Sequence, residues 1–384
     1  MRFFHLSDLH IGLKLVNHDL KEDQTFILRQ IADQAAQRQP DAVVIAGDIY
    51  DKAIPAAEAV ALFDEFITQL RNALPQGEIM LISGNHDSAQ RVDLFRQVLA
   101  RHKIHLIGLP PRRPEEYITQ VTLTDSFGPV NFYLLPFVKP SMVKEITGTD
   151  AKGNNLSYDE AVHALLSREN IDTDQRNVLV SHQFYLSTAG QDIVRSDSES
   201  ITVGNIDSVN GDILELFDYA ALGHIHKPQR LNGQDCYRYC GTPLACSISE
   251  AGQEKGIIEV ELGAKGEVNT TVLPLTPLHA VRKIQDTLEN VLTSPSTDYV
   301  SITLTDEDDL DIFDMHDRLS AAFPNLLEIR RAVKQKVNYE GADIPQEQLS
   351  PFELCKTFLG ELEDADEALL ADIINTVQDK RTEA

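Results

Sequence analysis

The sequence of 384 residues predicts an α/β fold in which helices cover a parallel sheet. Short, fully apolar runs at residues 42–45 and 79–82 have the composition of strands that are buried on both faces. Helical patterns at residues 25–36 and 56–72 alternate with the strand-like runs. This alternation predicts βαβ units, and therefore a parallel sheet with covering helices.

Later apolar runs extend the predicted first domain to about residue 275. The runs at residues 237–239 and 256–261 are expected to be late, antiparallel strands. The other expected strands are residues 132–135, 178–180 and 219–222. Two prolines and a more acidic composition near residues 274–277 mark the boundary, so we assign residues 1–275 to one domain.

Three further segments are expected after this boundary. Residues 276–334 predict a small α/β unit, because a strand-like run at 300–304 precedes a helical pattern at 310–323. Residues 335–349 are polar and contain a glycine and a proline, which is typical of a linker. Residues 350–384 begin with a capping-box pattern and predict two short amphipathic helices, which need another surface to bury their apolar faces.

The charge balance limits the classes of nucleic-acid protein that fit this sequence. Sixty Asp and Glu residues against 34 Lys and Arg residues give a formal net charge of −26. This charge disfavours binding to DNA mainly through a diffuse basic field. A nucleic-acid enzyme remains compatible with it, because bound metal ions and a partner subunit can supply local positive charge.

The sequence also predicts a cytoplasmic protein that does not enter a membrane. No apolar run approaches the roughly 18–20 residues that span a bilayer. His5 and Asp8 interrupt the apolar stretch that a signal peptide would need at the start of the chain. The four cysteines are too few for a disulfide scaffold, so we expect reduced thiols in a reducing compartment.

Polar side chains that can bind metal ions follow five of the apolar runs. In chain order they are Asp8 and His10; Asp48 and Asp51; Asn85, His86 and Asp87; His182; and His224 and His226. Ligands of an open α/β sheet bind outside the carboxyl ends of its strands, so we expect these five loops to converge. Each short motif alone is weak, but the ordered set predicts a metal centre.

The residue types fit a two-metal phosphoester site. Such a site holds two divalent ions about 3.5–4 Å apart, and the two oxygens of one carboxylate can bridge them. Asp48 is the natural bridge. Two further ligand sets are then Asp8, His10 and His226 for one ion, and Asn85, His182 and His224 for the other. Imidazole, carboxylate and amide donors suit Mn²⁺, Fe²⁺ or Zn²⁺ better than Mg²⁺.

His86 is the candidate for proton transfer, because it directly follows a ligand on an extended loop. It can face the substrate and protonate the leaving oxygen. Asp51 is a candidate to orient His86. Asp87 competes for that role, although it can also cap a helix expected at residues 91–99. His5 lies inside the first strand, and we expect it to be structural.

The arrangement resembles the calcineurin-like metallophosphoesterase superfamily, and more closely its SbcD family of bacterial nuclease subunits. The segments that carry the resemblance are residues 6–12, 46–51, 84–88, 196–199, 222–226 and 239–243. It implies a two-sheet α/β sandwich with helices outside. It also implies two bound Mn²⁺ ions, with Asp8, His10, Asp48, Asn85, His182, His224 and His226 as ligands. His86 is then the catalytic histidine, and Asp51 pairs with it.

The resemblance further implies an assembly and an activity. Residues 276–334 become a DNA-capping domain, and residues 350–384 dock an SbcC-type ABC ATPase with coiled-coil arms. Two nuclease and two ATPase subunits form a heterotetramer that contains a homodimer of this chain. ATP is bound by the partner, since this chain lacks a Gly-x-x-x-x-Gly-Lys-Ser/Thr loop. The implied activity is a DNA exonuclease on double-stranded ends and an endonuclease on hairpins, in repair and recombination.

Two other functions compete with the nuclease. A phosphatase or small-molecule phosphodiesterase would use the same metal core, but it would not need the residues after 275. An Asp-Arg-Gly continuation is also missing, because Lys52 and Ala53 follow Asp51. A scaffold without activity is disfavoured by the complete set of metal ligands.

Overall fold

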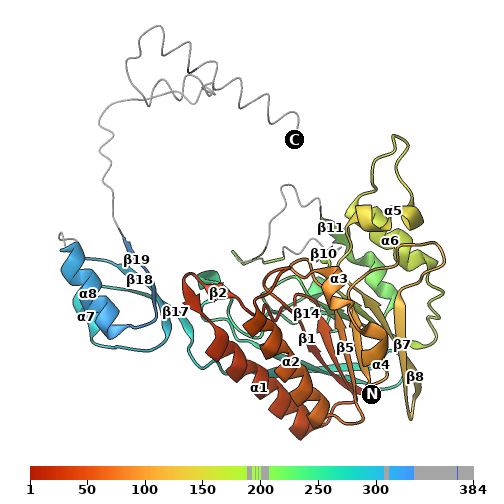
Figure 1. Ribbon diagram of the computed structural model, residues 1–384, viewed down its shortest axis with the longest axis horizontal. Coiled ribbons are helices and arrows are strands. Elements are labelled where there is room, and N and C mark those ends of the chain that lie inside the picture. Colours follow the sequence, from red (N-terminus) through yellow and green to blue (C-terminus); the bar gives the residue numbers. More distant parts are fainter. Residues whose placement is uncertain are drawn as a thin grey trace. The chain divides into compact units, whose positions relative to one another are not determined.

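The computed structural model describes residues 1–187, 193–194, 196–197, 199, 207–306, 311–332 and 370. The chain divides into two units, Met1–Ala332 and Val333–Ala384 (Figure 1). The expected linker lies outside the described residues, and so does the expected helix pair except for residue 370. The fold is therefore that of the first unit. Among the described residues, no helix is both long and apolar enough to cross a bilayer.

Two six-stranded sheets form the centre of the first unit. The first has the order β16-β15-β1-β4-β5-β6, with four parallel and two antiparallel strands. Its parallel strands are β1 (Arg2–Leu6), β4 (Ala42–Ala46), β5 (Glu78–Ile82) and β6 (Ile104–Ile107), and its antiparallel strands are β15 (Gly256–Leu262) and β16 (Val268–Pro274).

The second sheet has the order β13-β14-β12-β9-β8-β7, and its two edge strands are antiparallel. The strands are β7 (Thr119–Asp125), β8 (Gly128–Leu135), β9 (Arg176–Ser181), β12 (Tyr219–Leu222), β13 (Gln229–Arg230) and β14 (Tyr237–Tyr239). The antiparallel pairing expected for residues 237–239 is confirmed only on one side, because β14 is antiparallel to β13 but parallel to β12. The antiparallel direction expected for residues 256–261 is confirmed by β15.

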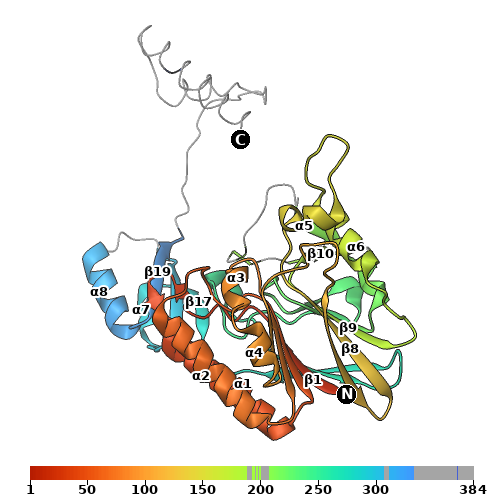
Figure 2. The ribbon, with the colours of Figure 1, turned by 45° about the vertical axis from the view of Figure 1, so that its right-hand side comes forward.

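Helices cover the outer faces of both sheets (Figure 1, Figure 2). Helices α1 (Lys21–Arg38) and α2 (Ala57–Ala73) pack on the first sheet, and α5 (Pro140–Thr147) and α6 (Tyr158–Arg168) pack on the second. Val43 and Ile45 of β4 face α1 and α2, whereas Val44 faces the core between the sheets. Both faces of β4 are buried, which explains its continuous apolar run. The predicted two-sheet α/β sandwich with helices outside is confirmed.

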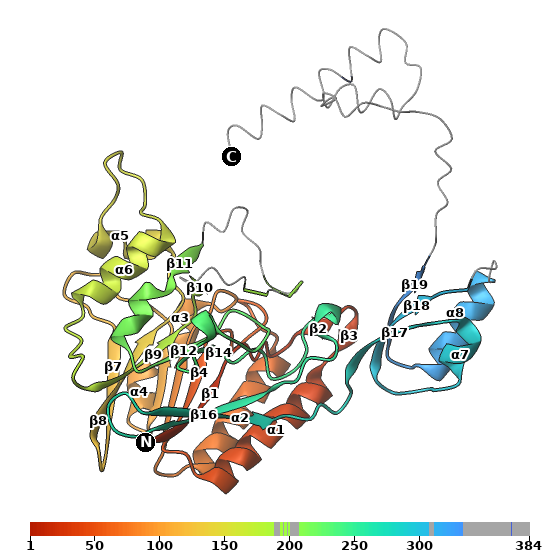
Figure 3. The same cartoon turned by 180° about the vertical axis from the view of Figure 1, so that it is seen from behind.

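A third, smaller sheet contains three parallel strands in the order β17-β18-β19. The strands are β17 (Val281–Asp286), β18 (Tyr299–Leu304) and β19 (Leu326–Arg331), and the helices that pack on them are α7 (Leu288–Leu292) and α8 (Ile312–Ala322) (Figure 3). The strand and helix agree with the patterns at residues 300–304 and 310–323. A DNA-capping role for residues 276–334 stays a prediction.

The remaining elements are short and lie in the connections. Helices α3 (Ala89–Val92) and α4 (Arg96–Ala100) follow β5. Two small two-stranded sheets pair β2 (Lys14–Leu15) with β3 (His18–Asp19), and β10 (Phe184–Leu186) with β11 (Ser208–Asn210). The 3₁₀ helices are η2 (Gly211–Leu216), η3 (Leu231–Gly233) and η4 (Ile248–Glu250).

The N-terminus is fixed by a charge cluster that predicts a measurable pH dependence. Arg176 donates to both oxygens of Asp125 at 3.0 and 2.5 Å, and the terminal ammonium lies 2.6 Å from Asp125 Oδ2. Arg176, and after it the ammonium, hold the pKa of Asp125 below its usual range. Because this pKa is lower in the folded than in the unfolded chain, the stabilisation is complete above about pH 4 and declines as the pH falls further.

We therefore expect Asp125→Asn to lower the free energy of unfolding at pH 7 by about 2–3 kcal/mol. The difference from the unsubstituted chain should shrink as the pH falls from 4 toward 3. Urea denaturation across this range measures both effects. Glu115→Gln is the matched control, because Glu115 is exposed and should change stability little at any pH. A loss that is equal at pH 7 and pH 3 would contradict the assignment to this carboxylate.

Candidate metal centre

Five loops meet at one edge of the sandwich, because the carboxyl ends of β1, β4, β5, β9 and β12 all lie there. Backbone hydrogen bonds join the first two loops, from Asp8 N to Gly47 O at 2.9 Å and from His10 N to Asp48 O at 3.0 Å. The N–H group of His224 donates to both carboxylate oxygens of Asp8, at 3.1 and 3.2 Å. Asp8 thereby ties the loop of the first sheet to the loop of the second.

The loops approach so closely that side chains are excluded at two glycines. A Cβ atom on Gly47 would lie 2.3 Å from Nδ1 of His182, and φ at Gly47 is +89°. A Cβ atom on Gly223 would lie 1.9 Å from the carbonyl oxygen of Ala46. Glycine is therefore required at both positions for the loops to converge.

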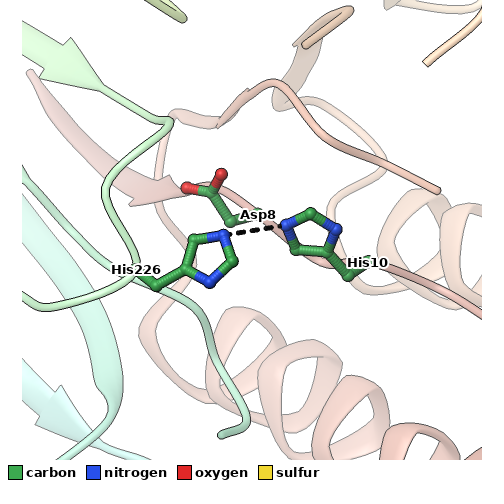
Figure 4. Close-up of side chains that lie close together, drawn as sticks. All are labelled: Asp8, His10 and His226. Carbon is green, nitrogen blue, oxygen red and sulfur yellow. Dashed lines mark hydrogen bonds between the residues drawn. The ribbon is translucent and has the colours of Figure 1, made fainter. Parts of the chain in front are cut away.

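One cluster contains Asp8, His10 and His226 (Figure 4). Nε2 of His10 lies 3.1 Å from Nε2 of His226, so the two rings turn these nitrogens toward the same point. All three side chains are buried. Nδ1 of His10 is buried as well, and it has no hydrogen-bond partner in the described part of the chain.

A second cluster contains Asp48, Asn85, His182 and His224. Nε2 of His182 lies 3.3 Å from Asp48 Oδ2 and 3.0 Å from Asn85 Oδ1. Nδ1 of His224 lies 3.0 Å from the same oxygen of Asn85. Asp48 Oδ2 is also 3.7 Å from Nε2 of His10, so the Asp48 carboxylate stands between the two clusters. The structure therefore brings together all seven side chains that were predicted as ligands.

The charges of these clusters favour a bound cation. Asp8 and Asp48 are buried, and neither forms an ion pair with a lysine or arginine of the described residues. Burial alone would lower the pKa of His182, but the neighbouring Asp48 carboxylate raises it to about 9. A proton on His182 thus compensates the buried carboxylate. A divalent ion can replace that proton, because metal binding displaces protons from its ligands.

The donors fit divalent transition-metal ions. Carboxylate oxygens, imidazole nitrogens and one amide oxygen gather in two adjacent groups, which is a mixed set that suits Mn²⁺, Fe²⁺ or Zn²⁺. Asp8, His10 and His226 can hold one ion, and Asn85, His182 and His224 can hold a second. Asp48 is placed to contact both.

His86 lies at the mouth of this centre and is partly exposed. Its backbone N–H donates to Asp48 Oδ1 at 2.8 Å, and its ring is 4.9 Å from that of His10. Nδ1 of His86 donates to the backbone carbonyl of Asp51 at 2.9 Å. Asp51 therefore contacts this histidine through its main chain, while the Asp51 carboxylate lies 4.0 Å from Nδ1 of His10.

Asp87 has a different role from the one expected for it. Its carboxylate accepts hydrogen bonds from the N–H groups of Ile49, Tyr50 and Gly84, at 2.9–3.0 Å. It thereby joins the loops after β4 and β5, and burial raises its pKa to about 6. The expectation that Asp87 caps the following helix is wrong, because Ser88 occupies the N-cap position of α3.

His5 is structural, as expected. It is fully buried in β1, where Nδ1 lies 3.0 Å from the Tyr219 hydroxyl and Nε2 lies 3.2 Å from Leu222 O. Burial lowers its pKa to about 3, so the ring is neutral at ordinary pH. The histidine joins the two sheets.

Three residues around His226 were not found by the sequence reasoning. Glu199 Oε1 accepts the backbone N–H of His226 at 2.8 Å. Glu250 and Lys255 form a buried ion pair at 2.6 Å beside the same histidine. Glu199 lies in one of the segments that carried the family resemblance, but no local pattern distinguished Glu250 or Lys255.

Comparison with known families defines the class. The family model of calcineurin-like phosphoesterases matches residues 1–228. Residues 276–362 match a second model, described as the type 5 capsule protein repressor C-terminal domain. The chain is thus an enzyme of the calcineurin-like phosphoesterase class.

A curated relative narrows this class. The SbcD subunit of the nuclease SbcCD from Staphylococcus epidermidis is 30% identical over 341 residues, which cover 87% of this chain and 86% of that protein. The chain therefore belongs to the SbcD family.

Solved structures give weaker likenesses. GAP50, the anchor in the inner membrane complex of Plasmodium, has a TM-score of 0.46 at 14% identity, with 87% of this chain and 98% of that chain covered. A dimetal phosphatase from Danio rerio has a TM-score of 0.42 at 13% identity, with 71% and 98% covered. At TM-scores below 0.5, these likenesses carry no weight for fold or function.

Proposed function

We propose that the chain is the Mn²⁺-dependent DNA nuclease subunit of an SbcCD-type complex. The observation that carries this proposal is the gathering of six side chains suited to metal binding, from five loops, around the buried Asp48 carboxylate, with His86 beside them. Membership of the SbcD family supports DNA as the substrate, since the curated relative is named a nuclease.

The clusters support an assignment of ligands to two ions. Asp8, His10 and His226 would hold one ion, Asn85, His182 and His224 would hold the other, and Asp48 would contribute to both. When bound, the ions supply Lewis-acid chemistry at the phosphodiester. The surrounding loops fix the ligands, because Asp8 and Asp87 each accept backbone N–H groups that join neighbouring loops.

His86 moves the proton to the leaving oxygen. The carbonyl of Asp51 can only accept a hydrogen bond, so Nδ1 of His86 must carry a hydrogen. Nε2 is then the nitrogen that gains and loses a proton in the reaction. A protonated Nε2 can donate to the departing 3′ oxygen. Asp51 thus orients His86 through its main chain.

The substrates and partners complete the proposal. The chain acts as a 3′–5′ exonuclease on double-stranded ends and as an endonuclease on hairpins and single strands, in cytoplasmic DNA repair and recombination. An SbcC-type ATPase binds ATP and controls access to the centre. Residues 350–384 dock this partner, and residues 276–334 cap the DNA. The relative's name supports such a complex.

A cleavage assay of the purified chain tests this function. The substrates are a hairpin-ended duplex and a small chromogenic phosphodiester, each in Mn²⁺, with and without an SbcC-type partner and ATP. We expect cleavage of the hairpin duplex, with ATP dependence when the partner is present. Turnover of the small diester with intact DNA under every condition would instead support a phosphodiesterase of small molecules.

A dimer contact is also part of the proposal. Leu94 and Phe95 lie between α3 and α4, Val98 lies in α4, and these three residues are 57%, 73% and 58% exposed. Clustered exposed apolar side chains are typical of protein contacts. We infer that the homodimer forms here.

We expect Phe95→Glu to weaken dimerisation by at least about 30-fold, because aromatic anchors often contribute about 2 kcal/mol or more. Light scattering over a concentration series measures the effect. Phe127→Glu is the matched control, since Phe127 is similarly exposed, at 60%, but lies in another part of the fold. Equal dimerisation in the Phe95 variant and the control would exclude this surface.

A further inference from the structure

His226 is held by the protein at several points. Its N–H group donates to Glu199, and its carbonyl oxygen accepts from Lys255 Nζ at 3.0 Å and from the N–H of Thr242 at 3.1 Å. Its ring nitrogens face different surroundings. Nε2 points to His10 in the metal centre, whereas Nδ1 lies 3.5 Å from Oε1 of Glu250. The ring therefore stands between the centre and Glu250.

Glu250 is a buried, charged group at the end of η4. Only 1% of the residue is exposed, and Oε2 accepts hydrogen bonds from Lys255 Nζ at 2.6 Å and Thr242 Oγ1 at 3.1 Å. The ion pair with the buried Lys255 ammonium stabilises the charge of this carboxylate inside the protein. An ionised carboxylate at Nδ1 favours the tautomer that carries its hydrogen on Nδ1 and leaves Nε2 free to bind metal.

Lys255 connects this carboxylate to the main chain of the same histidine. Its ammonium donates to His226 O, Thr242 Oγ1, Glu250 Oε2 and Gln253 Oε1, at 2.6–3.0 Å. Lys255 is only 7% exposed, so protein groups rather than water surround its ammonium. The four oxygens are enough to accept from all three N–H donors. The buried pair thus contacts both the ring and the backbone carbonyl of His226.

We propose that Glu250 and Lys255 are positioning residues that set the tautomer and the direction of His226 for the ion held with Asp8 and His10. The proposal rests on the metal centre of the proposed function. Carboxylates that accept from the outer nitrogen of a metal-binding histidine raise its basicity and fix its ring. Neither Glu250 nor Lys255 touches the substrate in this account, so they act only through His226.

Mn²⁺ titration calorimetry of the full chain tests the proposal, because it reports the two ions separately from activity. We expect Glu250→Gln to weaken one of the two ions by about 10- to 100-fold and to leave the other unchanged. Glu254→Gln is the matched control, since Glu254 is an exposed neighbour of the buried pair. His182→Ala marks the other ion, and its effect should fall on the site that Glu250→Gln spares.

A second variant tests whether the loss of metal binding comes from a loss of stability. Glu250→Gln combined with Lys255→Met removes both charges, so that no unpaired ion stays buried. This double variant should lose the same single ion. A cooperative thermal unfolding transition of the metal-free variant would confirm that it is folded. Equal weakening of both ions in these variants would assign the pair a merely structural role and overturn the proposal. Unchanged Mn²⁺ binding in these variants would overturn only the positioning role of Glu250 and Lys255. A native chain that binds no Mn²⁺ would overturn the proposed function as well.

Discussion

Asp48→Asn should abolish Mn²⁺-dependent cleavage and remove at least one of the two ions. The substitution keeps the size of the side chain but replaces the charge between His10 and His182 with a neutral amide. One carboxylate oxygen that could bridge the ions becomes an amide nitrogen, which is a poor ligand. We expect a fall in cleavage of more than about 10⁴-fold, because both ions of the proposed centre would depend on this carboxylate. Metal analysis of the purified variant and the hairpin assay measure the two effects.

The control for this prediction is Asp218→Asn. Asp218 accepts the N–H of Asn177 at 2.7 Å beside the amino ends of β9 and β12, at the opposite edge of the second sheet. Its substitution alters the charge of a comparable side chain without touching the centre. Full metal content and cleavage in Asp48→Asn would refute the bridging position, and an equal loss in Asp218→Asn would point to a general loss of folding.

The convergence of the five loops could be predicted because each is marked by a local pattern. A buried parallel strand has an apolar run, and the polar residue after it must lie at the strand's carboxyl end. Asp8, Asn85 and His182 were found in this way, although they are far apart along the chain. The direction of β14 could not be found, because a strand of three residues carries no pattern that distinguishes parallel from antiparallel pairing.

The groups behind the centre could not be predicted for a different reason. Glu250 is the last residue of a 3₁₀ helix, and Lys255 follows that helix. In such a segment no helical or strand periodicity predicts which face of the fold a side chain lies on. Their contact with His226 arises only when β12, η4 and β15 are packed together. The choice between Asp51 and Asp87 also required coordinates. Sequence spacing cannot tell a contact made by a carbonyl from one made by a carboxylate, and here the carbonyl of Asp51 reaches His86.

His86→Ala should lower DNA cleavage by about 10²- to 10⁴-fold while both Mn²⁺ ions still bind. General acid catalysis by one histidine is typically worth that much. The metal centre should survive, because His86 supports Asp48 through its backbone N–H, which alanine retains. Single-turnover cleavage with the partner and ATP at saturating Mn²⁺ isolates the chemical step, and calorimetry confirms the occupancy of both sites.

Asp51→Ala separates the role of the main chain from that of the side chain in this mechanism. The backbone carbonyl of Asp51 accepts the hydrogen bond from Nδ1 of His86, so the variant should keep the ring in place and lose far less activity than His86→Ala. If Asp51→Ala is as inactive as His86→Ala while binding both ions, the carboxylate itself must act on the proton. If the His86→Ala variant loses an ion, its loss of activity is explained by weaker metal binding. That result would contradict the assignment of His86 as the proton donor.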